Sequence, residues 1–182
     1  MEESQELPSK RLLNFLKRID IVIPLLDGLY IYHKTPNLSW KELQYGLNKH
    51  YINESEVSRY ASEALTLDSC DKQVELASLC TQELFNAHEL LRSLTQNTNN
   101  EKDPSKVWIY ILLSWLFENK HHYNDPFETI DEIYADFGYP EEVSTHIRYI
   151  PTTEGSATSE DQLAHNWAEF LSSYEQELRN TV

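Results

Sequence analysis

Glycine and cysteine are both scarce in this chain, with four and two residues respectively among 182. Few glycines disfavour folds that are rich in tight turns, because positive φ angles suit glycine best. The cysteines, Cys70 and Cys80, are ten residues apart, which is about 15 Å along a helix. That separation is beyond disulfide reach. We expect both cysteines to be buried thiols rather than redox or metal-binding groups.

Basic residues are the second shortage: 15 Lys and Arg face 30 Asp and Glu, a net charge of −15. Phosphate contacts need Lys and Arg, so we expect no nucleic-acid partner. An anionic membrane surface would repel the chain for the same reason. The field would instead attract a basic protein or metal cations.

Long hydrophobic runs are also missing. The longest, residues 107–117, is interrupted by Ser114 and is shorter than the roughly 20 residues that span a bilayer. The first residues, Met-Glu-Glu-Ser-Gln-Glu, are acidic and polar, unlike a secretory signal peptide. We therefore expect a cytoplasmic protein.

The composition suits a globular core, since 40% of residues are hydrophobic and 12% aromatic. A chain of this length buries roughly 70% of its unfolded surface. No linker is long enough to divide it, although residues 96–103 are the best candidate boundary. We predict a single helical domain over residues 1–182, with both sides of that boundary packed together.

Helical periodicity dominates the sequence and predicts an all-α fold, an irregular bundle of about seven to nine helices. Its centre is a helix over about 104–121, which Asp103 and Pro104 open as N-cap and first residue. That helix is apolar almost all round, and such helices lie inside bundles. Further helices are predicted at 9–19, 71–95, 126–137 and 140–147, with others beginning after Ser39, Asn53 and Ser159.

Two regions need comment. Residues 21–33 are ambiguous, because Asp27-Gly28 is a hairpin signal whereas Pro24 suits a first helical position. We favour an extended segment followed by a helix over about 24–33.

Gly46, beside Trp40 and Tyr45, lies inside a helix, where glycine costs about 1 kcal/mol relative to alanine. It would let another helix or an aromatic ring approach closely, for core packing or for a contact surface.

The acidic residues are concentrated near the end of the chain. Residues 118–182 hold 14 Asp and Glu against three bases, Lys120, Arg148 and Arg179, a net charge of −11. The 126–137 helix has an apolar stripe, and the rest of its surface is acidic. Two of its carboxylate pairs are i,i+4 pairs, each costing a few tenths of a kcal/mol. This candidate partner-binding surface comprises Glu128, Asp131, Glu132, Asp136, Glu141 and Glu142. The alternative is an ordinary solvated face, paired in part with Arg148.

Catalytic and metal signals are weak. Glu118 and His122 are i,i+4 and could chelate a metal, but no further ligand is defined. The other histidines are scattered and have no nucleophile motif beside them. The two helices around 39–66 resemble a helix-turn-helix in layout, yet acids crowd the second, which opposes DNA binding. We assign no catalytic residue, no metal and no cofactor, and lean towards a protein that is not an enzyme.

Several separated motifs resemble a bacterial family known only as a domain of unknown function. They are Leu38-Ser39-Trp40-Lys41-Glu42-Leu43-Gln44-Tyr45-Gly46-Leu47, the run Trp108 to Phe117, Asp125-Pro126, Ile133 to Glu142, Arg148-Tyr149-Ile150-Pro151 and Asn166-Trp167. The resemblance covers roughly residues 35–175. It implies a small acidic helical protein of the kind suspected to act as immunity proteins beside toxin genes. The resemblance supplies no catalytic residues.

Together these observations predict a non-enzymatic protein-binding protein. The most specific form is an immunity protein that neutralises a basic, nuclease-like toxin by covering its phosphate-binding residues with carboxylates. The alternatives are a metal-dependent hydrolase that uses clustered carboxylates, and a general regulatory or scaffold protein. The partner's identity and the oligomeric state stay open.

Overall fold

The computed structural model describes residues 24–96, 103–138 and 160–180, and in these ranges the chain is all-α, as predicted. The predicted helices at 9–19 and 140–147, the cap at Ser159, and Glu141 and Glu142 lie outside the described residues. The helices are α2 (Gly28–Lys34), α3 (Trp40–Asn48), α4 (Glu54–Glu63), α5 (Asp71–Ala77), η1 (Leu84–Asn86), α6 (Ala87–Thr95), α7 (Pro104–Asn119), η2 (Lys120–His122), α8 (Pro126–Asp136) and α10 (Glu160–Asn180), where η marks a 3-10 helix.

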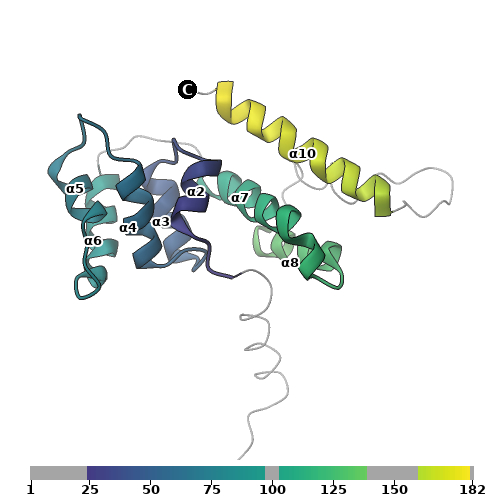
Figure 1. Ribbon diagram of the computed structural model, residues 1–182, viewed down its shortest axis with the longest axis horizontal. Coiled ribbons are helices and arrows are strands. Elements are labelled where there is room, and N and C mark those ends of the chain that lie inside the picture. Colours follow the sequence, from purple (N-terminus) through teal and green to yellow (C-terminus); the bar gives the residue numbers. More distant parts are fainter. Residues whose placement is uncertain (1–23, 97–102, 139–159, 181–182) are drawn as a thin grey trace, which may run out of the picture.

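The helices form two groups joined by α7 (Figure 1). Helices α2 to α6 gather at one end, where α4 packs on α2 and α5, and α6 packs on α3 and α5. Helix α7 extends from this group, contacts α3 there, and carries α8 and α10 along the rest of its length. The expected packing of the segments on both sides of residues 97–102 is confirmed by the contact of α3 with α7. Their assignment to one domain stays a prediction.

The predicted helix starts agree well with the structure. Ser39 and Glu42 form a reciprocal capping box at α3. The Asn53 side chain accepts a hydrogen bond from the backbone N–H of Glu56 at 3.0 Å and so caps α4. Asp103 caps α7, with Pro104 as its first residue. These starts are decided locally, because each cap joins groups only two or three residues apart.

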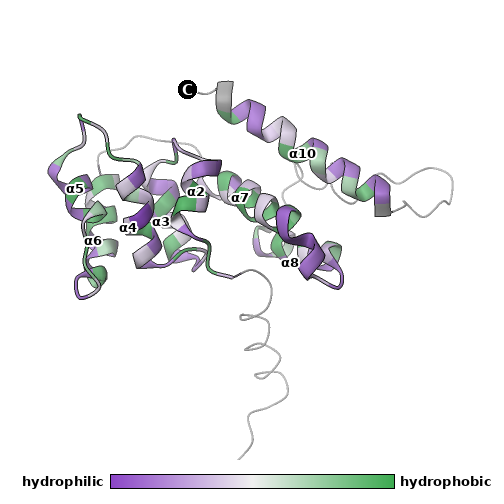
Figure 2. Ribbon diagram, viewed as in Figure 1, coloured by the Kyte–Doolittle hydropathy of each residue, from purple (hydrophilic) through white to green (hydrophobic). Residues whose placement is uncertain are grey.

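Helix α7 is central, as predicted, but its α-helical part ends at Asn119 and residues 120–122 turn into η2. In Figure 2 this helix is mainly hydrophobic, whereas α10 alternates between hydrophilic and hydrophobic. Its buried residues cover every side: Val107, Trp108, Ile109, Tyr110, Ile111, Leu112, Leu113, Ser114 and Leu116. No described helix combines the length and the apolarity needed to cross a bilayer.

Glycine at position 46 is explained by Trp108 of α7. A Cβ built on Gly46 would lie 1.8 Å from Cζ2 of the Trp108 indole, so only glycine permits this approach. The indole is fully buried and its N–H donates a hydrogen bond to the Glu42 carbonyl at 2.7 Å. Of the two roles expected for this position, the core-packing one is confirmed.

The predicted helix over 71–95 is wrong. The chain forms α5, a turn, η1 and α6 instead. The Ser78 hydroxyl donates to the Val74 carbonyl at 2.8 Å, while its backbone N–H bonds to the carbonyls of Val74 and Glu75. Side chains of this type compete with the helical ladder and so favour a helix end. The buried side of α5 also differs from the predicted one: Leu76 is fully buried, whereas Val74, which belongs to the apolar stripe of the predicted 71–95 helix, is 47% exposed.

Both cysteines are exposed, so the prediction of buried thiols is also wrong. Cys70 is the N-cap residue of α5, and Cys80 lies in the turn that follows α5. Both are free and exposed. Positions at the ends of a short surface helix face solvent, whereas the interior of one long helix would have offered a buried face.

Helix α2 also differs from its predicted bounds, since it begins at Gly28 and not at Pro24. Asp27 is its N-cap residue, and its carboxylate accepts the N–H groups of Leu29 and Tyr30 at 2.8 and 3.1 Å. The favoured order, an extended segment followed by a helix, is confirmed. The Asp27-Gly28 pair therefore caps a helix and does not form a hairpin.

Candidate partner-binding surface

Helix α8 supplies the candidate surface, and its start follows from local chemistry. The Asp125 carboxylate accepts hydrogen bonds from the N–H groups of Phe127 and Glu128, and Pro126 is the first helical residue. The helix ends at Asp136, and Gly138 follows with φ of +72°, a conformation in which glycine is favoured. These signals were all visible in the sequence.

The inner side of α8 is held at both ends by aromatic contacts. Near its start, the Phe127 ring lies 6.2 Å from that of Trp167 on α10. Just past its end, the Phe137 ring stacks on Tyr51 at 5.7 Å. Ile130 and Ile133 are buried between these contacts. The helix is thus fixed in orientation, and its remaining side is turned outward.

The outward side carries the predicted carboxylates. Glu128 and Asp136 are exposed, and Asp131 and Glu132 are partly exposed. Among the residues that the structure describes, no ion pair joins Glu128, Glu132 or Asp136 to a basic side chain. The structure therefore brings four of the six predicted residues onto one helix and does not describe the other two.

Two electrostatic terms oppose this arrangement. Glu128 with Glu132, and Glu132 with Asp136, are like-charge i,i+4 pairs, each costing a few tenths of a kcal/mol. Asp136 also lies in the last turn, which holds no basic residue, and there the helix dipole disfavours a negative charge by about 0.3–1 kcal/mol. A positively charged partner bound to these carboxylates would replace each of these unfavourable interactions by a favourable one.

Tyr51 links the end of α8 to the α2–α6 group. Burial raises the pKa of its hydroxyl, and Tyr45 and Asp136 act in the same direction through their charges. The backbone carbonyl of Tyr51 also accepts a hydrogen bond from the N–H of Leu26 at 2.9 Å. Tyr51 therefore contacts both the segment before α2 and Phe137, the residue that follows α8.

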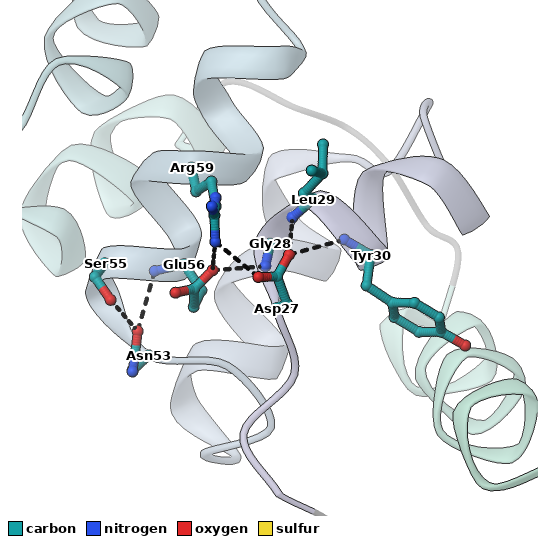
Figure 3. Close-up of polar contacts among 8 residues, drawn as sticks. All are labelled: Asp27, Gly28, Leu29, Tyr30, Asn53, Ser55, Glu56 and Arg59. Atoms are coloured by element: carbon teal, nitrogen blue, oxygen red, sulfur yellow. Dashed lines mark hydrogen bonds and ion pairs between the residues drawn. The ribbon is translucent and has the colours of Figure 1, made fainter. Parts of the chain in front are cut away.

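A second charged cluster joins α2 to α4 (Figure 3). The Arg59 guanidinium lies 2.7 Å from the Asp27 carboxylate and 3.7 Å from that of Glu56. Glu56 also accepts the N–H of Gly28 at 2.8 Å. A Cβ on Gly28 would lie 2.0 Å from the Glu56 carbonyl oxygen. The cluster fixes two backbones at close range, and the single positive charge of Arg59 is shared between two carboxylates.

The weak metal signal at Glu118 and His122 is not reproduced as a helical pair. Glu118 is the next-to-last residue of α7 and forms an ion pair with Lys34 of α2. His122 lies beyond the helix end in η2, where its ring is 4.0 Å from that of His121. Within the described part of the chain, no group of three or more His, Cys, Asp or Glu residues is arranged to hold a metal.

Comparison with known families bears directly on these motifs. A model of DUF2247, described as an uncharacterized protein conserved in bacteria, matches residues 29–175. The chain belongs to this family. The matched range starts within α2, includes α8 and closes within α10, so the predicted resemblance to a bacterial family of unknown function is confirmed. No curated protein and no solved structure matched.

In this DUF2247 protein, sequence patterns did not reveal three features near the end of α8 and the start of α2. The stacking of Tyr51 on Phe137 joins residues far apart in the chain, and no local signal marks it. The exposure of Leu25, which is 53%, has no local signal either. The favoured prediction places Asp27 inside a helix over about 24–33, yet its acidic side chain before an apolar stretch is also a valid N-cap signal.

Proposed function

We propose that this protein is a non-enzymatic binding protein whose α8 carboxylates receive a basic protein partner. The observation that carries the proposal is the outward face of α8, where acids occupy positions that cost stability. Solubility alone would not require an aspartate in the last turn of α8, four positions after Glu132, where the two carboxylates repel each other. A basic partner converts the repulsion into attraction.

The specific form of the proposal is an immunity protein for a nuclease-like toxin. A nuclease binds phosphates through Lys and Arg, and carboxylates at matching positions would occupy those residues and exclude the nucleic acid. Long-range attraction would speed association and make it depend on salt. Exposed charge pairs contribute at most about 1 kcal/mol each, so slow dissociation also requires buried contacts. We place the protein in the cytoplasm, where it would meet such a toxin.

Two matched variants test the proposal in affinity purification from the bacterium that encodes the chain. The first carries Glu128→Lys, Glu132→Lys and Asp136→Lys on α8. The control carries Glu63→Lys, Asp68→Lys and Glu75→Lys, three exposed residues at the α4–α5 end. Both variants change the net charge equally, so a general charge effect acts on both.

The expected result is one basic protein that co-purifies stoichiometrically with the unmodified chain and with the control at low salt. It should be lost with the α8 variant and at high salt. The association rate of that protein, measured by surface plasmon resonance, should fall at least about tenfold for the α8 variant. Equal binding by both variants would refute a role for α8. Recovery of a small molecule or metal with the chain would favour the hydrolase alternative.

A further inference from the structure

A short stretch before Pro24, residues 9–19, has a charge opposite to that of the whole chain, whereas Glu2, Glu3, Glu6 and Asp20 lie on either side of it. Residues 9–19 contain Lys10, Arg11, Lys17 and Arg18 and no acid, in a chain with a net charge of −15. Leu12, Leu13, Phe15 and Leu16 are interleaved with these bases. The segment lies outside the residues that the structure describes and before residue 29, where the family match begins.

The point at which this segment joins the described structure is close to α8. The Leu26 N–H donates to the carbonyl of Tyr51 at 2.9 Å, and the Tyr51 ring stacks on Phe137 at 5.7 Å. Asp136 acts electrostatically on the hydroxyl of the same tyrosine. Tyr51 therefore connects the two: its backbone contacts Leu26 near the start of the described chain, and its ring contacts Phe137 at the end of α8.

The surface at this junction is both apolar and acidic. Leu25 is 53% exposed, and Tyr51 and Phe137 are each only partly buried. Asp136 directly precedes Phe137 at the end of α8, and Glu132 lies one turn earlier on the same helix. An occupant that matches both properties needs apolar side chains alternating with basic ones, which is the composition of residues 9–19.

The tether is long enough for such an occupant. Arg18 is six residues before Pro24, a span of at most about 20 Å when extended. Helix α8, with its 11 residues, is about 16 Å long. Lys17 and Arg18 can therefore reach the carboxylates at the near end of α8. Lys10 and Arg11, with seven further residues of tether, can reach the far end.

We propose that residues 9–23 dock on this surface within the same chain, with their apolar residues on Leu25, Tyr51 and Phe137 and their bases on the α8 carboxylates. This inference deepens the proposed function and rests on it in one respect: the segment occupies the face that a basic partner would use. A short tether gives an effective concentration in the millimolar range, so even a weak contact is mostly formed. The partner would have to displace the segment.

The test uses the full chain in isolation. A mixture of ¹⁴N- and ¹⁵N-labelled protein is treated at low salt with a carbodiimide, which couples lysine amines to adjacent carboxylates. Peptide mass spectrometry should then find Lys10 or Lys17 joined to Glu128, Glu132 or Asp136 with one isotope in both halves. Links of mixed isotope would show that a second copy is the occupant, and links to other acids would place the segment elsewhere. Either result overturns the proposal, as does the absence of links.

Trypsin gives an independent readout, because it cleaves after the four bases of the segment itself. Docking should slow that cleavage. The Glu128→Lys, Glu132→Lys, Asp136→Lys variant should be cut at least about tenfold faster than the Glu63→Lys, Asp68→Lys, Glu75→Lys control. Circular dichroism verifies that both variants are folded. Equal cleavage rates for the two folded variants would overturn the docking.

The two hypotheses can fail separately. Cross-links to α8 without any captured partner would leave the docking standing and refute the proposed function. Capture of a partner that binds α8, together with an absence of cross-links in the isolated chain, would support the proposed function and refute the docking.

Discussion

Replacing Gly46 by alanine is the most direct test of the packing in this fold. On an exposed helix the change stabilises a protein, because alanine has a helix propensity about 1 kcal/mol better than that of glycine. Here the added Cβ would lie 1.8, 2.3 and 2.5 Å from three atoms of the Trp108 indole. The backbone of α3 or the indole must therefore move by more than 1 Å.

The expected cost has two parts. Overpacking a filled core costs about 1–3 kcal/mol. The displaced indole also loses its hydrogen bond to the Glu42 carbonyl, and a buried donor without a partner costs about 1–3 kcal/mol. After subtraction of the gain in propensity, we expect Gly46→Ala to lower the free energy of unfolding by about 1–5 kcal/mol. Typical domains have about 5–15 kcal/mol in total.

The measurement is urea unfolding followed by circular dichroism, with a double-mutant cycle as control. In a Trp108→Leu background the clashing ring is absent, so Gly46→Ala should be neutral or stabilise by up to about 1 kcal/mol. A change of sign between the two backgrounds is the diagnostic result. If Gly46→Ala were neutral in the unmodified chain, the close approach of α3 to Trp108 would be refuted.

Two further predictions concern charge and pH. In a chain in which Lys10, Arg11, Lys17 and Arg18 are replaced by serine, no docked base offsets the repulsion on α8. In that background, Asp136→Lys should raise the free energy of unfolding by about 0.5–1 kcal/mol in urea unfolding, because it relieves repulsion with Glu132 and suits the helix dipole. A destabilised variant there would contradict this account of α8. Burial raises the pKa of the Tyr60 hydroxyl, which donates to the Thr35 carbonyl at 3.0 Å. Its folded pKa lies above the unfolded value of about 10, so its contribution to stability is complete below pH 10 and decreases at higher pH. Tyrosinate absorbance from buried tyrosines should appear together with the loss of helical dichroism, and full ionisation in a helical protein would contradict it.

Helix starts were predicted well because their causes are local. The caps at Ser39, Asn53, Asp103 and Asp125 each join a side chain to a backbone group two or three residues away. The central position of α7 was predictable for a similar reason, since a helix without a polar face must be surrounded by protein. The acidic side of α8 also followed from periodicity alone.

Errors arose where tertiary contacts outweighed the local pattern. The apolar stripe of 71–95 is consistent with one long helix, yet the chain breaks at Ser78 and buries Leu76 in place of Val74. Packing α5 against both α4 and α6 requires that reversal, and no short-range signal encodes it. Cys80 lies in the turn that this break creates, and it is exposed.

The sequence by itself therefore determined the class of fold, the helix caps, the central helix and the acidic character of α8, because each depends on periodicity or on neighbours within one turn. Only the tertiary structure decided what these helices touch. It placed Trp108 against Gly46, Phe137 on Tyr51, and Leu26 of the segment before α2 against the backbone of Tyr51. Such contacts join residues separated by tens of positions, and side-chain shape selects them only when the whole core is packed.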